Sequence, residues 1–197
     1  LPRGIDNSSG DIAFLPDDRR FGPLDGMTIG TSYGACQHYV VLREEIAGRS
    51  QGGVVPLKGD FLSGVHRTRF NPKDGHFYLA GSSGWETYAA EPGCLQRVRY
   101  VRGDLHLPRS VETRENGLIV RFNCQVDPAS VRVKNAFAQQ WNYLYSKAYG
   151  SAEYSPKNPS RLGHDPVEIR SVHPLENGRA VFVEIPQLHP VMQFHLY

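Results

Sequence analysis

The chain has 197 residues, of which 40% are hydrophobic and 21% are charged, a composition that excludes a disordered protein. The formal net charge is only +2, and no run of lysine or arginine stands out, so we expect no nucleic-acid partner. No apolar stretch approaches the roughly 20 residues that span a bilayer, so we expect no membrane span. The length suits one large or two small domains.

Turn-forming residues divide the first half of the chain into short segments with period-two alternation. Twenty glycines and fourteen prolines are spread along the sequence, and no segment keeps a helical period over three turns. This pattern predicts an all-β chain, although residues 40–47 leave one or two helical turns open as an alternative. The expected strands of the first half are 12–15, 28–32, 37–43, 53–57, 65–70, 76–80 and 95–101.

The clearest rhythm lies in residues 69–100. The turn Asn71-Pro-Lys-Asp-Gly75 leads into an alternating strand, a glycine-rich loop follows, and a second strand begins near Gly93. That order is typical of one β-propeller blade, and seven short strands make about two four-stranded blades. Because a closed propeller typically needs about 4–8 blades, we expect the chain to be part of something larger.

Composition shifts at residues 102–109, which we interpret as a linker, and the second half again reads as strands without a sustained helix. Asn177-Gly178 is a strong hairpin turn because both residues tolerate positive φ. The pattern predicts an Ig-like β-sandwich, so the expected domains are 1–104, propeller-type blade sheets, and 105–197, the sandwich. The loop 147–164 is long and polar, which is typical of a functional or mobile segment. The expected strands of this half are 110–113, 118–124, 136–145, 167–172, 179–185 and 191–197, with one or two helical turns open at 127–131.

Two segments carry a family resemblance, SGVHRTRFNPKDGHFYLAG at 63–81 and GCLQRVRY at 93–100. They resemble the glucose/sorbosone dehydrogenase-like β-propellers, in particular large relatives from planctomycetes, verrucomicrobia and gemmatimonads. The resemblance extends over almost the whole chain. It implies the last propeller blades followed by an Ig-like domain, in a periplasmic or extracellular protein. The implied partners are the remainder of a longer polypeptide or another subunit, cytochrome c among them.

The founding activity of that family is oxidation of a sugar hydroxyl by pyrroloquinoline quinone (PQQ). The resemblance implies that an Arg-x-Arg pair before the turn grips the quinone carboxylates, which makes Arg67 and Arg69 the candidate cofactor-binding residues. On a strand, their spacing places both guanidiniums on one face, where they could bind carboxylates bidentately. The alternative is a pair of edge arginines that bind local carboxylates.

A group of aromatic residues in and beside the long loop forms the second candidate site. Tyrosine and tryptophan suit protein interfaces and sugar stacking because they join apolar area to a polar group. Packing between the two domains, a partner-protein surface and carbohydrate binding all remain open for this group. Its members are Trp141, Tyr143, Tyr145, Tyr149 and Tyr154.

No catalytic residue is assigned from the sequence. The eight histidines show no HxH, HExxH or His-plus-carboxylate spacing, and the three cysteines form no CxxC pair, so no metal site is expected and their redox state stays open. We therefore expect a non-catalytic structural or docking portion of a dehydrogenase-like propeller protein, with no cofactor in this chain. The alternatives are part of a PQQ-dependent sugar dehydrogenase and a carbohydrate-binding module.

Overall fold

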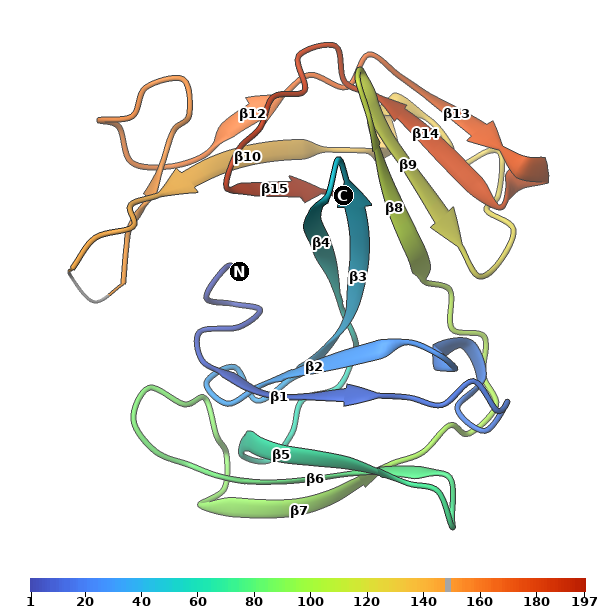
Figure 1. Ribbon diagram of the computed structural model, residues 1–197, viewed down its shortest axis with the longest axis vertical. Helices are drawn as coiled ribbons and strands as arrows, with labels where there is room; N and C mark the ends of the chain where they lie inside the picture. The colour runs from blue at the N-terminus through green and yellow to red at the C-terminus, as the bar shows by residue number, and fades with distance from the viewer. Residues whose placement is uncertain (148–149) are drawn as a thin grey trace. The chain divides into compact units, whose positions relative to one another are not determined.

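A computed structural model describes residues 1–147 and 150–197, which form fifteen strands and three short 3-10 turns (Figure 1). The expectation of an all-β chain is confirmed: four antiparallel sheets are present, and none of them is closed. The chain divides into two compact units, Leu1–Leu107 and Pro108–Tyr197.

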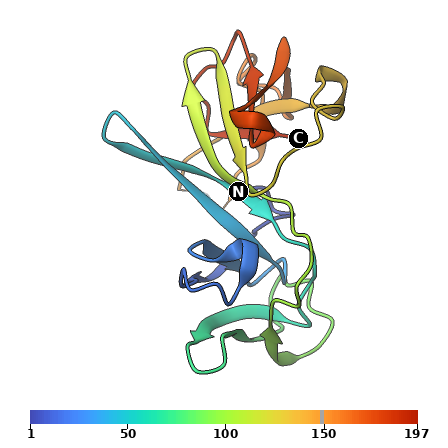
Figure 2. The ribbon, with the colours of Figure 1, turned by 90° about the vertical axis from the view of Figure 1, so that its right-hand side faces the viewer.

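The first sheet of unit 1 is a four-stranded meander in the order β1-β2-β3-β4. The β3–β4 hairpin turns at Ala47 and Gly48, which have φ values of 49° and 75°. The helical alternative for 40–47 is wrong. Eight residue pairs join β3 to β4, and this pairing provides the backbone hydrogen bonds that a helical turn would otherwise provide. The outer part of the hairpin projects as a two-stranded ribbon (Figure 2). The strands are β1 (Ser9–Phe14), β2 (Thr28–Ser32), β3 (His38–Ile46) and β4 (Arg49–Pro56).

The second sheet of unit 1 has three strands in the order β5-β6-β7. They are β5 (Gly64–Asn71), β6 (His76–Ser82) and β7 (Gly93–Val98). The turn between β5 and β6 is the predicted one. Gly75 has φ 72° there, and the Asp74 carboxylate accepts hydrogen bonds from the Asn71 side chain, the His76 N–H and the Tyr78 hydroxyl.

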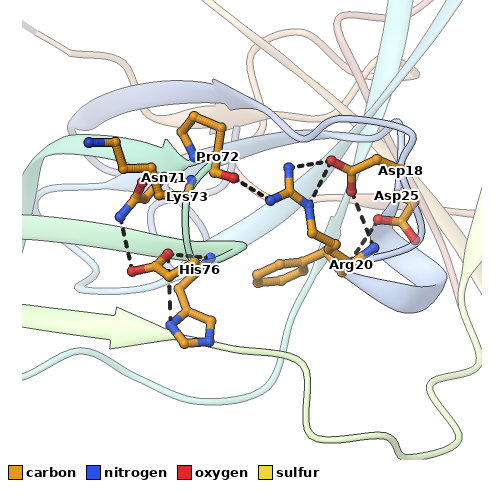
Figure 3. A network of polar contacts seen from close by, with 9 residues as sticks. Asp18, Arg20, Asp25, Asn71, Pro72, Lys73 and His76 are labelled. Atoms are coloured by element: carbon orange, nitrogen blue, oxygen red, sulfur yellow. Dashed lines mark hydrogen bonds and ion pairs between the residues drawn. The ribbon is translucent and has the colours of Figure 1, made fainter.

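The two sheets of unit 1 approach each other at β1 and β5. A Cβ atom on Gly10 would collide with the carbonyl oxygen of Val65, so glycine is required for this approach. Arg20 links the same region, because its guanidinium donates to the carbonyl of Pro72 and to Asp18 (Figure 3). The guanidinium also lies 5.3 Å from the centre of the Phe70 ring. The loop that contains the short turn η1 (Gly22–Leu24) is thereby held to the β5–β6 turn.

Unit 2 contains two more antiparallel sheets. One has the order β13-β14-β9-β8, and in the other β10 pairs with β15, β12 and β11. Leu118, Val183 and Ile185 form the centre of its core. The strands of the first sheet are β8 (Pro108–Arg114), β9 (Gly117–Phe122), β13 (Ser171–Leu175) and β14 (Ala180–Glu184). Those of the second are β10 (Ala138–Tyr143), β11 (Glu153–Tyr154), β12 (Asp165–Val167) and β15 (Gln193–Leu196).

Three local predictions in unit 2 can be compared with the structure. Residues 167–172, expected as one strand, are divided: Val167 ends β12, Ser171 begins β13, and the two strands pair in different sheets. Residues 127–131 form a hydrogen-bonded turn that precedes η2 (Val133–Asn135). The predicted hairpin turn joins β13 to β14 through η3 (Glu176–Gly178), where all three residues have positive φ.

Candidate functional site

Side-chain alternation divides the β5-β6-β7 sheet into a covered face and an open face. On the covered face, Thr68, Phe77 and Leu79 are each at most 2% exposed. The opposite face carries side chains that remain in solvent. This division follows directly from the sequence, because neighbouring residues of a strand point to opposite sides.

The open face carries three arginines, which we call the arginine face: Arg67, Arg69 and Arg97. The strand register places Arg67, Ala80 and Leu95 in one cross-strand row and Arg69, Tyr78 and Arg97 in the next. All three arginines are exposed. Arg67 and Arg69 were predicted as a pair, but Arg97 was not, because its place beside them depends on the register of β6 with β7.

Asp11 on β1 ties the arginine face to the first sheet. Its Oδ2 atom accepts the backbone N–H of Thr68 at 2.9 Å and lies 3.2 Å from the guanidinium of Arg69. Its Oδ1 atom accepts the N–H of Ile12. Desolvation raises the pKa of Asp11, but the hydrogen bonds from Thr68 and Ile12 and the charge of Arg69 together hold it below its usual value.

These contacts decide how well Arg67 and Arg69 suit a bound quinone. The Arg69 side chain is 78% exposed and already paired with Asp11, and each guanidinium donates to the carbonyl of the residue before it. A carboxylate ligand at Arg69 would compete with Asp11 for the guanidinium. Arg69 thus has a local carboxylate partner, and we derive no chemistry through PQQ.

The outer edge of β7 is the second feature of this sheet. The N–H of Thr68 donates to Asp11 and therefore points away from β6, so Thr68 and Leu79 form a non-hydrogen-bonded pair. The backbone N–H and C=O groups of Leu79 therefore point toward β7, where Leu79 and Gln96 form a hydrogen-bonded pair. The alternation leaves the N–H and C=O groups of Leu95 and Arg97 pointing outward, and no strand of the described chain, 1–147 and 150–197, pairs with them.

Two side chains of β7 on the covered face of the sheet form hydrogen bonds with the segment before β5. The Gln96 carboxamide oxygen accepts the N–H of Leu62 at 2.8 Å, and the Ser63 hydroxyl donates to the sulfur of Cys94 at 2.9 Å. Leu95, by contrast, is 77% exposed. The covered face of β7 is thus held by hydrogen bonds, and its open face is exposed to solvent.

The predicted aromatic site is divided by the structure. Trp141 is only 4% exposed, and its ring stacks on His164 with 4.0 Å between the ring centres. Tyr143 and Tyr145 are 41% and 96% exposed, whereas Tyr154 is half-buried in β11. Tyr149 lies outside the described residues. The exposed rings are therefore the ones available for a partner.

The segment before β12 is organised around a buried carboxylate that sequence reasoning missed. Asp165 is 2% exposed and accepts hydrogen bonds from the Ser155 hydroxyl, the Lys157 N–H and the Arg161 guanidinium. Desolvation raises the pKa of Asp165, but these donors and the charge of Arg161 hold it below its usual value. The contacts order this part of the predicted loop, and His164 next to Asp165 is placed on Trp141.

No protein-family model, curated protein or solved structure matches the chain. Among residues 1–147 and 150–197, no group of three or more His, Cys, Asp or Glu side chains is placed to hold a metal ion. Within the same residues, no helix is long and apolar enough to cross a membrane.

Proposed function

We propose that the chain is a structural or docking module of a larger protein or complex, and that the β5-β6-β7 sheet is its docking element. The observation that carries this proposal is the open state of that sheet. Its arginine face is exposed and its β7 edge has no partner strand in the described residues, while the sheet before it in the chain has a fourth strand. Exposed strand edges are normally protected or paired, because they template pairing with another chain.

In this proposal the two sheets of unit 1 are propeller-type blades, and unit 2 is an Ig-like sandwich. The antiparallel meander of each unit 1 sheet and the two-sheet composition of unit 2 support the assignment. The remaining blades belong to the rest of a longer polypeptide or to another subunit, in a periplasmic or extracellular setting. This follows the resemblance of segments 63–81 and 93–100 to dehydrogenase-like propellers.

The docking role is tested by measuring the molecular mass of the protein purified from its natural source at native expression. Size-exclusion chromatography with light scattering should give a mass well above the 22.1 kDa of this chain. Cross-links from lysines or carboxylates near the second sheet should lead to the same partner segment in repeat preparations. A solitary, monodisperse monomer of this chain would contradict the docking role.

A further inference from the structure

We propose that the outer edge of β7 binds an extended acidic segment of a partner protein, which adds to the sheet as its fourth strand. This inference rests on the docking role proposed above and specifies the chemistry of the partner. It follows from three features of unit 1: the direction of the β7 backbone groups, the rigidity of the strand and the charge of the face beside it.

The backbone groups supply the pairing. The N–H and C=O groups of Leu95 and Arg97 point outward, as the register and the Thr68–Asp11 hydrogen bond require. A partner strand can therefore form up to four main-chain hydrogen bonds over this length. No proline or bulge interrupts β7, and its register with β6 is regular over six pairs. These features, which commonly protect an edge strand, are therefore missing from β7, and another strand can pair with it.

The rigidity of β7 lowers the cost of binding. Gln96 and Cys94 are held by Leu62 and Ser63 on the covered side, so the outward groups are already in strand geometry before a partner arrives. A partner then loses mainly its own conformational freedom, which is the usual benefit of a preorganised surface.

The charge selects the partner. Arg97 lies on the open face next to the edge, Arg99 follows it at the same spacing, and no ion pair within residues 1–147 and 150–197 is formed by either. An added strand would place a side chain directly opposite Arg97, and Arg99 follows just beyond the end of β7. Glutamate or aspartate at that position is favoured by cross-strand pairing, and lysine or arginine is disfavoured.

A second copy of this chain is a weaker candidate for the occupant. Two β7 strands paired with Arg97 opposite Arg97 would place like charges directly opposite each other, which destabilises a strand pair. A register with Arg97 opposite Leu95 avoids that repulsion but gives neither arginine a carboxylate partner. Leu95, two residues before Arg97 and 77% exposed, favours an apolar residue at one position of the incoming strand.

The test uses the full chain and two capped eight-residue peptides, one with glutamate alternating with valine and one with lysine in place of glutamate. Amide hydrogen exchange measured by NMR reports on each residue of β7. The glutamate peptide should slow exchange at Leu95 and Arg97 about tenfold, the amount expected for one to two net hydrogen bonds. The lysine peptide should leave both amides unchanged.

Three variants separate strand addition from simple charge attraction. Arg97→Pro removes an outward N–H without touching the β6–β7 hydrogen bonds, and proline is tolerated at such edge positions. It should abolish binding, while Arg97→Ala keeps the N–H and should weaken binding only in part. Arg97→Glu should reverse the preference in favour of the lysine peptide, and protection of its Leu95 amide by that peptide is the second test of strand addition where Arg97→Pro does not fold.

Several outcomes would overturn the inference: equal binding of both peptides to the native chain, protection at amides other than Leu95 and Arg97, or undiminished binding by folded Arg97→Pro. These outcomes are distinguishable from failure of the docking role. A natural assembly that leaves the β7 amides unprotected refutes the strand addition alone. A solitary natural monomer refutes the docking role even where the peptide binds.

Discussion

The carboxylate of Asp11 accepts the backbone N–H of Thr68 at 2.9 Å, and this bond links two sheets that are separate in the strand order. It satisfies an edge donor of β5 that has no partner strand. It also fixes the direction of the β5 backbone, from which the outward groups of β7 follow. The relationship therefore organises both the fold of unit 1 and its proposed docking edge.

Replacing Asp11 by alanine should destabilise unit 1 by about 2 kcal/mol, because the Thr68 and Ile12 donors lose their acceptor. The folded-state pKa of Asp11 is lowered, so its contribution is present above the ordinary value of 3.8 and is lost as the pH falls through the folded pKa. Urea unfolding at pH 7 and pH 3 measures both effects. Asp104→Ala, at an exposed position of the same unit, is the control and should change neither.

His38 should make unit 1 less stable in mild acid. Burial lowers its pKa to about 4 from 6.5, although the charge of Asp60 opposes the shift, and its ring packs on Phe61. The unfolded chain therefore binds a proton between pH 6.5 and 4 that the folded chain does not. Stability should fall by about 3 kcal/mol as the pH drops through this window.

The control for this prediction is His38→Gln, which stays neutral over the whole range. Exchange protection of the β3 amides, followed from pH 7 to pH 4, should decline more steeply in the native chain than in the variant. Parallel curves for the two proteins would show that His38 is not the titrating group.

Removal of the Asp165 carboxylate should disrupt the end of the long loop in unit 2. Asp165→Ala leaves the Ser155 hydroxyl, the Lys157 N–H and the Arg161 guanidinium without their acceptor, at a cost of about 3 kcal/mol. Because His164 directly precedes Asp165, the Trp141–His164 stack should loosen, and Trp141 fluorescence should change under native conditions. An unaltered spectrum and stability would contradict the role given to this carboxylate. Lys134→Ala, at an exposed position, is the control.

The aromatic residues should separate into a structural and a surface group. Trp141→Ala removes a buried, stacked ring and should destabilise unit 2 by about 4 kcal/mol. Tyr145→Ser should change stability by less than about 0.5 kcal/mol, because the side chain is 96% exposed. If Tyr145 belongs to a partner surface, the same variant should weaken assembly with the natural partner, as measured by light scattering.

Much of this fold could be predicted from alternation and turn residues. The expected strand 28–32 coincides with β2, and the turn ending at Gly75 is where the sequence places it. What alternation could not supply is anything created by contacts between distant segments. The two-residue strand β11 pairs with β10, and the loop after it is hydrogen-bonded to Asp165. Neither the short strand nor the buried carboxylate produces a periodic pattern in the sequence.

The candidate site divides in the same way. Arg67 and Arg69 are two residues apart, so their common face could be predicted from spacing alone. The neighbourhood of Arg97 depends on its pairing with Tyr78, and the partner of Arg69 is Asp11, 58 residues earlier in the chain. Spacing within one strand carries no information about either contact.

Amide hydrogen exchange along β7, compared between this chain alone and the natural assembly, tests the central claim most directly. In the chain alone, Leu95 and Arg97 should exchange rapidly while Cys94, Gln96 and Val98 are protected by β6. In the assembly, Leu95 and Arg97 should become protected by about tenfold or more. Uniform protection along β7 in the chain alone, or no change at these two amides in the assembly, would contradict the claim that this edge is a docking element.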